Sequence, residues 1–103
     1  HFHTGLDIAA PQGTPIHAAA AGTVTAAGWN NYGYGYMVEI DHGNGLVTLY
    51  GHMMQQPSVS VGEQVSQGET IGYVGTTGNS TGDHCHFGVE LNGVWVNPYN
   101  YLP

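Results

Sequence analysis

The close spacing of glycines limits what this chain can fold into more than any other feature of its sequence. There are 17 glycines in 103 residues, and they divide the apolar residues into short stretches. No stretch keeps apolar residues at positions i, i+3, i+4 and i+7 over several helical turns, which is the pattern of an amphipathic helix. The run Ala18–Ala21 has helix propensity, but Gly22 and the β-branched Thr23-Val24-Thr25 follow it at once. We therefore expect a compact, mostly antiparallel all-β domain with no substantial helix.

Short segments rich in β-branched and aromatic residues alternate with turn residues along the chain. Two of the intervening segments, Asp41–Gly45 and Asn92-Gly93, are typical of hairpin turns. The glycines between Val59 and Gly75 predict a tight β-meander. No change in composition marks a linker, so residues 1–103 are expected to form one domain. The expected strands are Pro15–Ala26, Tyr36–Asp41, Leu46–Tyr50, Val59–Val65, Thr70–Val74, His84–Leu91 and Val94–Val96.

The charge of the chain excludes several functions. Seven Asp and Glu residues stand against no Lys or Arg, which gives a formal net charge of −7 with histidine neutral. A nucleic-acid-binding protein needs cations against the phosphates, and lipoyl- or biotin-carrier domains need a lysine to modify. No apolar run reaches the roughly 18 residues of a membrane helix, so we expect no membrane insertion. The sequence starts at His1 rather than Met, and we expect an N-terminal part of a parent chain to precede it.

The pair His84 and His86 is the sharpest chemical feature. Residues two apart on a strand point to the same face, so these imidazoles share one face and lie about 6.6 Å apart along it. The opposite face then carries Cys85, Phe87 and Val89, as expected for a core side. A Cys thiolate binds zinc well, but Cys85 points away from both histidines, which favours a buried core residue.

Two further segments carry histidines. On a straight strand the side chains of His3 and Asp7 would start about 13 Å apart, too far to reach one metal ion. Gly5 permits the bend that would bring them together, although an ordinary N-terminal loop explains the segment as well. His52 would close a strand beside a glycine. Together the three segments offer a His₂Asp metal set with two spare imidazoles, the composition of a catalytic zinc site with an open position.

The three segments together resemble the signature of the lysostaphin/LytM-type zinc endopeptidases of peptidoglycan. The pattern is His3-x-x-x-Asp7, Tyr50-x-His52 and His84-x-His86. The resemblance implies a lysostaphin/LytM fold and an enzyme that hydrolyses peptide cross-links of the bacterial cell wall. The likeness runs from His3 to Leu102 and includes Gly5–Pro11, Gly13–Ile16, Gly22–Val24, Ile40–Gly43, Gly78–Gly82 and Val96–Pro98.

The resemblance also implies a role for each site residue. His3, Asp7 and His86 would bind Zn²⁺, and His52 and His84 would be the catalytic pair beside the open metal position. Zinc lowers the pKa of a bound water from about 15.7 to about 7. One uncoordinated imidazole could take the proton of that water and pass one to the leaving amine, while the other could hydrogen-bond the developing oxyanion. Between the two we favour His84 as the base.

The chain departs from the usual residues of this family at three positions. Cys85 stands where the family has an apolar residue such as Leu, Gly88 where it commonly has Glu, and His1 where it often has Arg. These departures bear on supporting contacts and the level of activity rather than on the chemistry. The segment Tyr32–Tyr36 is either one wall of a substrate groove or an irregular hairpin end with exposed tyrosines.

Two other functions remain open from the sequence. One is a weak or inactive member that acts as a cell-wall-binding or regulatory module, and the other is an engineered scaffold that keeps the site. For an active enzyme, the sequence leaves open whether glycine-rich bridges or bonds between D-Ala and a diamino acid are cut. The resemblance implies a secreted, periplasmic or cell-wall-associated protein, and we expect a monomer.

Overall fold

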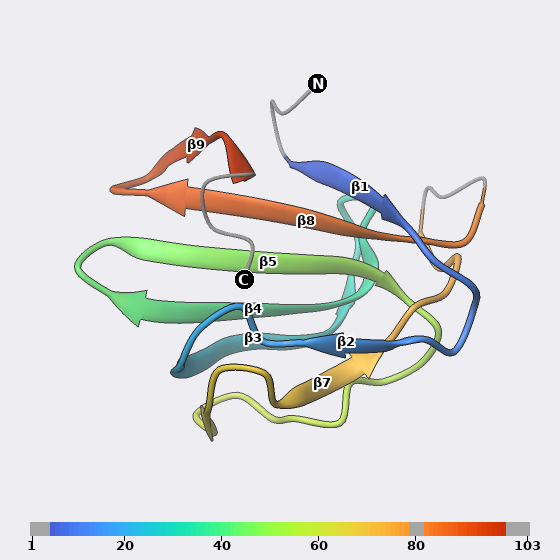
Figure 1. Ribbon diagram of the computed structural model, residues 1–103, viewed down its shortest axis with the longest axis horizontal. Coiled ribbons are helices and arrows are strands. Elements are labelled where there is room, and N and C mark those ends of the chain that lie inside the picture. Colours follow the sequence, from blue (N-terminus) through green and yellow to red (C-terminus); the bar gives the residue numbers. More distant parts are fainter. Residues whose placement is uncertain (1–4, 79–81, 99–103) are drawn as a thin grey trace.

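The computed structural model describes residues 5–78 and 82–98, and these contain strands but no α-helix (Figure 1). The predicted all-β, mostly antiparallel fold is confirmed. In the same residues, no helix has the length and hydropathy to cross a membrane. The strands are β1 (Leu6–Ala9), β2 (Pro15–His17), β3 (Gly22–Asn30), β4 (Gly35–Gly43), β5 (Leu46–Met53), β6 (Gln64–Val65), β7 (Thr70–Tyr73), β8 (His84–Leu91) and β9 (Val94–Val96).

Most strands belong to one antiparallel sheet, in the order β1-β8-β5-β4-β3-β6, with β9 also beside β8. β1 pairs with the first residues of β8 and β9 with its last, so both lie along the edge of β8 that faces away from β5 (Figure 1). A second sheet consists of β2 and β7 alone. It packs on one face of the large sheet, and the hydrophobic core fills the space between them. The other face of the large sheet is therefore available for a site.

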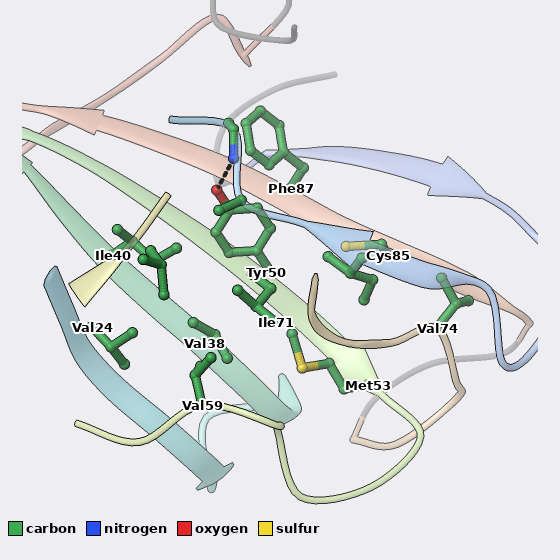
Figure 2. Packing of buried hydrophobic residues seen from close by; sticks show 14 of the residues in the cluster. Val24, Val38, Ile40, Tyr50, Met53, Val59, Ile71, Val74, Cys85 and Phe87 are labelled. Atoms are coloured by element: carbon green, nitrogen blue, oxygen red, sulfur yellow. Dashed lines mark hydrogen bonds between the residues drawn. The ribbon is translucent and has the colours of Figure 1, made fainter. Parts of the chain in front are cut away.

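Tyr50 lies at the centre of this core and is 2% exposed (Figure 2). Its hydroxyl oxygen accepts a hydrogen bond from the Ala19 N–H at 3.0 Å, and the hydroxyl donates to Thr48 Oγ1 at 2.7 Å. Thr48 in turn donates to His42 Nε2 at 2.6 Å, because His42 Nδ1 is the nitrogen that donates to the Ala21 carbonyl. Each polar group buried here thus has a partner, as the apolar surroundings require. Burial raises the pKa of Tyr50 above its usual value of 10.0, so the phenol stays protonated.

Two strand predictions are wrong, and both fail where the chain passes between the two sheets. The expected strand Pro15–Ala26 is divided into β2 and β3, which lie in different sheets. The residues between them bond elsewhere: Ala18 exchanges backbone hydrogen bonds with Glu69 and Gly68. The expected meander from Val59 to Gly75 does not pair with itself either, because β6 pairs with β3 and β7 with β2.

The hairpin predictions are confirmed. Asn44-Gly45 and Asn92-Gly93 all have φ between 52° and 82°, the left-handed region that two-residue hairpins use. β1 is an additional strand that the sequence did not predict. Its pairing with β8 places Asp7 directly opposite His86, one of the predicted site histidines.

The hydrogen bonds of Tyr50 predict the effect of removing its hydroxyl. Tyr50→Phe leaves the Ala19 N–H without its partner and removes the hydroxyl that donates to Thr48 Oγ1, which costs about 1–3 kcal/mol of unfolding free energy. Urea unfolding measures this loss. Tyr73→Phe is the control, because the half-buried Tyr73 hydroxyl makes no hydrogen bond with a residue that the structure describes. Equal effects of the two changes would contradict the role given to the Tyr50 chain.

Candidate active site

The register of three neighbouring strands places the site residues in one row. His86 on β8 lies opposite Asp7 on β1 and opposite Gly51 on β5. Directly opposed residues of an antiparallel pair share a face, so these three positions lie on one face. The neighbouring pair Tyr50 and Phe87 points to the other face and is buried in the core. The row therefore lies on the face that the small sheet leaves uncovered.

Asp7 contacts both histidines of β8. Its Oδ1 lies 2.9 Å from His86 Nδ1 and 3.5 Å from His84 Nε2. The Asp7 side chain is 64% exposed, whereas those of His84 and His86 are 18% and 12% exposed. Cys85 is buried on the opposite face at 6%, as predicted, and burial raises the pKa of its thiol to about 12. Cys85 is thus a core residue and stays protonated at neutral pH.

His52 reaches the same face through a β-bulge. Met53 pairs with Tyr36 and Tyr50 pairs with Val38, so two residues of β5, Gly51 and His52, oppose a single residue of β4. His52 has φ of 60°, a left-handed conformation that is uncommon for residues other than glycine. In a regular strand His52 would share the core face of Tyr50; the bulge turns it toward β8 instead. Its ring centroid lies 4.8 Å from that of His84 and 6.1 Å from that of His86.

Three hydrogen bonds hold His52 in this conformation. Its N–H donates to the Tyr34 carbonyl at 2.7 Å, and its carbonyl accepts from the Gly75 N–H at 3.0 Å. The ring Nδ1 lies 2.7 Å from the carbonyl oxygen of Thr77. Sequence reasoning missed Thr77, and no motif marks it, because the group that touches His52 is a backbone carbonyl.

Burial lowers the pKa of His52 below its usual value of 6.5. The nearby His84 and His86 lower it further, whereas the hydrogen bond to Thr77 and the charge of Asp7 act in the opposite direction. At neutral pH His52 is therefore a neutral imidazole with one nitrogen able to accept a proton. That state is the one a general base needs.

Tyr34 closes one side of the histidine cluster. Its ring centroid lies 5.3 Å from that of His86 and 6.4 Å from that of His52. The contact depends on Gly51, because a Cβ there would come within 3.1 Å of Tyr34 Cδ1. Of the predicted groove segment, Tyr34 thus borders the site, while Tyr32 is 91% exposed.

The described residues include two of the three predicted metal ligands, Asp7 and His86. Within residues 5–78 and 82–98, no three His, Cys, Asp or Glu side chains form a group that could hold a metal ion. His3, the remaining predicted ligand, lies outside the described residues. Two atoms that bind one tetrahedral zinc at 2.0–2.2 Å lie about 3.4 Å apart. The 2.9 Å between Asp7 Oδ1 and His86 Nδ1 needs only a small adjustment to reach that spacing, so this donor pair fits zinc.

Comparison with known proteins then assigns the family. The sequence profile of Peptidase family M23 matches residues 1–98. The chain belongs to this family.

Relatives of this M23 chain are longer proteins. It is 49% identical over 97 residues to "DD-carboxypeptidase/endopeptidase Mpg" of Neisseria meningitidis, covering 94% of this chain and 22% of Mpg. Among solved structures, lysostaphin from Staphylococcus simulans matches with a TM-score of 0.89 and 34% identity, over 97% of this chain and 43% of lysostaphin. A zinc-containing peptidase from Vibrio cholerae matches with a TM-score of 0.84 and 33% identity, over 91% of this chain and 28% of the other. The M23 chain thus spans about a fifth of the length of Mpg.

Gly5 of the M23 chain lies against Phe87 and His86 beside this site, and its replacement tests the packing there. Gly5 has φ of 147°, and a Cβ would lie 2.4 Å from the Phe87 carbonyl oxygen and 2.8 Å from His86 Nε2. Gly5→Ala therefore combines backbone strain with overpacking, and we expect a loss of about 2–5 kcal/mol in unfolding free energy.

Gly13→Ala is the matched control for Gly5→Ala. Gly13 also has positive φ, 89°, but a Cβ there has nothing within 4 Å. It should therefore show the cost of strain alone, about 1–3 kcal/mol. Urea unfolding of both variants separates the two contributions, and a Gly5→Ala variant no less stable than Gly13→Ala would contradict the packing described here.

Proposed function

We propose that this M23 domain is a zinc-dependent endopeptidase that hydrolyses peptide cross-links of bacterial peptidoglycan. The observation that carries the proposal is the convergence of Asp7, His86, His84 and His52 from three strands onto the face of the large sheet opposite the small sheet. A structural histidine pair would not require a third histidine in a strained conformation beside it. The membership of the chain in a peptidase family gives this arrangement its chemistry.

Zinc is the metal that suits these donors. His3, Asp7 and His86 would be the ligands, and two imidazoles with one carboxylate are a usual set for catalytic zinc. When bound, zinc supplies a water acidic enough to lose a proton near neutral pH. A solved relative of this fold is itself described as a zinc-containing peptidase.

His52 and His84 are oriented to handle protons. His84 Nδ1 lies 2.9 Å from the Gly82 carbonyl, as His52 Nδ1 lies 2.7 Å from that of Thr77. A carbonyl only accepts, so in both rings Nδ1 donates, and in the neutral form of either ring the lone pair is then on Nε2. Two such acceptors, 4.8 Å apart between ring centroids, can orient an attacking water that has two hydrogens to donate.

We assign the base to His84, whose Nε2 lies 3.5 Å from the ligand carboxylate of Asp7. After taking the proton of the attacking water, His84 would carry an Nε2–H that can protonate the leaving amine. His52 would hold the water as an acceptor through its own Nε2. Since its Nε2 has no hydrogen in this tautomer, His52 could stabilise the oxyanion only after it gains a proton.

For the substrate we favour a cross-link flanked by D-amino acids over a glycine bridge. The support is the higher identity to Mpg, whose name describes a DD-carboxypeptidase/endopeptidase, than to lysostaphin. We also propose that residues 1–103 form one catalytic domain, acting as a monomer outside the cytoplasm where peptidoglycan lies. With no Lys or Arg, the domain has no charge complement for nucleic acid.

The proposal is tested by metal content and cleavage together. The chain purified after growth with zinc should contain about one zinc, release peptides from purified peptidoglycan and cut a D-Ala–diaminopimelate cross-linked muropeptide. Phenanthroline should stop the cleavage and added zinc restore it. Zinc binding without cleavage of this muropeptide or of pentaglycine would instead support a binding module.

Asp7→Asn and His86→Ala should lower zinc affinity by at least about 10–100-fold, because each removes a donor. Glu90→Gln is the control, since Glu90 lies on the same strand and face as His86 but opposite Val47, away from the row of Asp7. Competition with a chromogenic chelator measures the affinities. Full zinc retention by His86→Ala would refute the ligand assignment.

His52→Asn separates chemistry from folding. Asn tolerates positive φ better than other residues with a side chain, so the unfolding free energy should change by no more than about 1 kcal/mol. The rate of cleavage should fall roughly 10²–10⁴-fold with zinc retained, and His84→Ala should do the same. His17→Asn, on the exposed side of the small sheet, should leave the rate unchanged. Loss of zinc from His84→Ala would show that His84, and not His86, is the ligand.

A further inference from the structure

Thr77 joins three elements that surround the strained histidine. It lies in the short loop after β7, and its Oγ1 accepts a hydrogen bond from the Tyr36 N–H of β4 at 3.0 Å. The same hydroxyl donates to the Met53 carbonyl at the end of β5, and the Thr77 carbonyl receives His52 Nδ1–H at 2.7 Å. Thr77 thus hydrogen-bonds to both strands of the bulge, β4 and β5, and to the ring of His52, the residue in the bulge.

The loop around Thr77 has little room to move. Gly78 and Gly35 lie backbone against backbone: a Cβ on Gly35 would come within 2.5 Å of Gly78 N, and a Cβ on Gly78 within 2.3 Å of the Gly33 carbonyl oxygen. Both glycines have positive φ, 66° for Gly35 and 75° for Gly78. The Thr77 carbonyl is therefore held at a fixed place relative to β4 and β5.

We propose that Thr77 is a positioning residue that holds His52 in a single tautomer, with hydrogen on Nδ1 and the lone pair on Nε2. A carbonyl oxygen has no hydrogen to donate, so a bond to it is possible only for a ring nitrogen that carries one. Neutral imidazole has one such nitrogen, and Thr77 determines which it is. Nothing about His52 alone would select this form.

The hydroxyl of Thr77 makes the carbonyl effective. Both hydrogen-bonding functions of Oγ1 are used, one accepting and one donating, so the hydroxyl fixes the residue on which the carbonyl sits. Serine offers the same two functions, whereas valine has the shape of threonine but neither function. Thr77→Ser should therefore preserve the tautomer, and Thr77→Val should release it by leaving the Tyr36 N–H and Met53 carbonyl without their partner.

The tautomer can be read directly, without activity. In a chain labelled with ¹⁵N-histidine, long-range ¹H–¹⁵N correlation distinguishes the ring nitrogen that carries hydrogen from the one that carries the lone pair. The spectrum is recorded on the chain in the metal state in which it is purified, and His52→Asn assigns the signal. We expect His52 in the Nδ1–H form in the parent and in Thr77→Ser, and a mixture of both forms in Thr77→Val.

The kinetic part of this inference rests on the proposed peptidase function, whereas the tautomer does not. Thr77→Val should lower kcat by about 10–100-fold, with KM within about twofold and zinc content unchanged; Thr77→Ser should recover most of the loss. Thr76→Val is the matched control, since the neighbouring Thr76 is exposed, and it should behave as the parent in both measurements.

Three results would overturn the proposal. An Nε2–H form of His52 in the parent chain would do so without any variant, even if Thr77→Val does not fold. A folded Thr77→Val that keeps the Nδ1–H form would do so as well. Loss of zinc from Thr77→Val with an unchanged His52 signal would move the role of Thr77 to the metal ligands. A chain that shows the expected tautomers but cuts no cross-link would refute the proposed function and leave the positioning role in place.

Discussion

The alternation of side chains along β8 ties the candidate active site to the stability of the fold. Cys85, Phe87 and Val89 are buried in the core on one face, and the two histidines between and before them lie on the other. A slip of one residue would bury the imidazoles and expose the core side chains, so hydrophobic burial fixes the register. The same register sets Asp7 opposite His86. Core packing, rather than any contact within the site, thus decides which side chains meet at the candidate site.

His52 is the exception, because it reaches the site by departing from the regular strand. A positive φ at a residue other than glycine costs about 1–3 kcal/mol. Its three hydrogen bonds, to Tyr34, Gly75 and Thr77, each contribute about 0.5–1.5 kcal/mol. The two amounts are of the same order, so the bulge persists only while its surroundings are complete. The site therefore combines two rigid histidines on a paired strand with a third that depends on neighbouring loops.

The sequence predicts what depends on periodicity and on local turn chemistry. The shared face of His84 and His86, the burial of Cys85 and the two Asn-Gly turns follow from rules that involve a few consecutive residues. The division between β2 and β3 does not, because both halves have strand-forming residues. The segment between them bonds to Tyr50, to His42 and to the Gly68-Glu69 turn, all distant in sequence. The contact of Thr77 with His52 could not be predicted from the sequence for a related reason. It is made by a backbone carbonyl, which any residue at position 77 would have. The roles of the site residues came from resemblance to a family, since spacing alone left His3 and Asp7 open to another explanation.

The absence of Lys and Arg affects the candidate site as well as the choice of binding partners. Asp7 is a well-exposed carboxylate whose described contacts at the site are histidines. In a chain with no Lys or Arg, no ammonium or guanidinium side chain can compete for that carboxylate. The formal charge of −7 also raises the local concentration of cations around the domain. A divalent ion bound by Asp7 and His86 would therefore displace no ion pair of Lys or Arg, and it would replace the Asp7–His86 hydrogen bond and part of the water around the carboxylate.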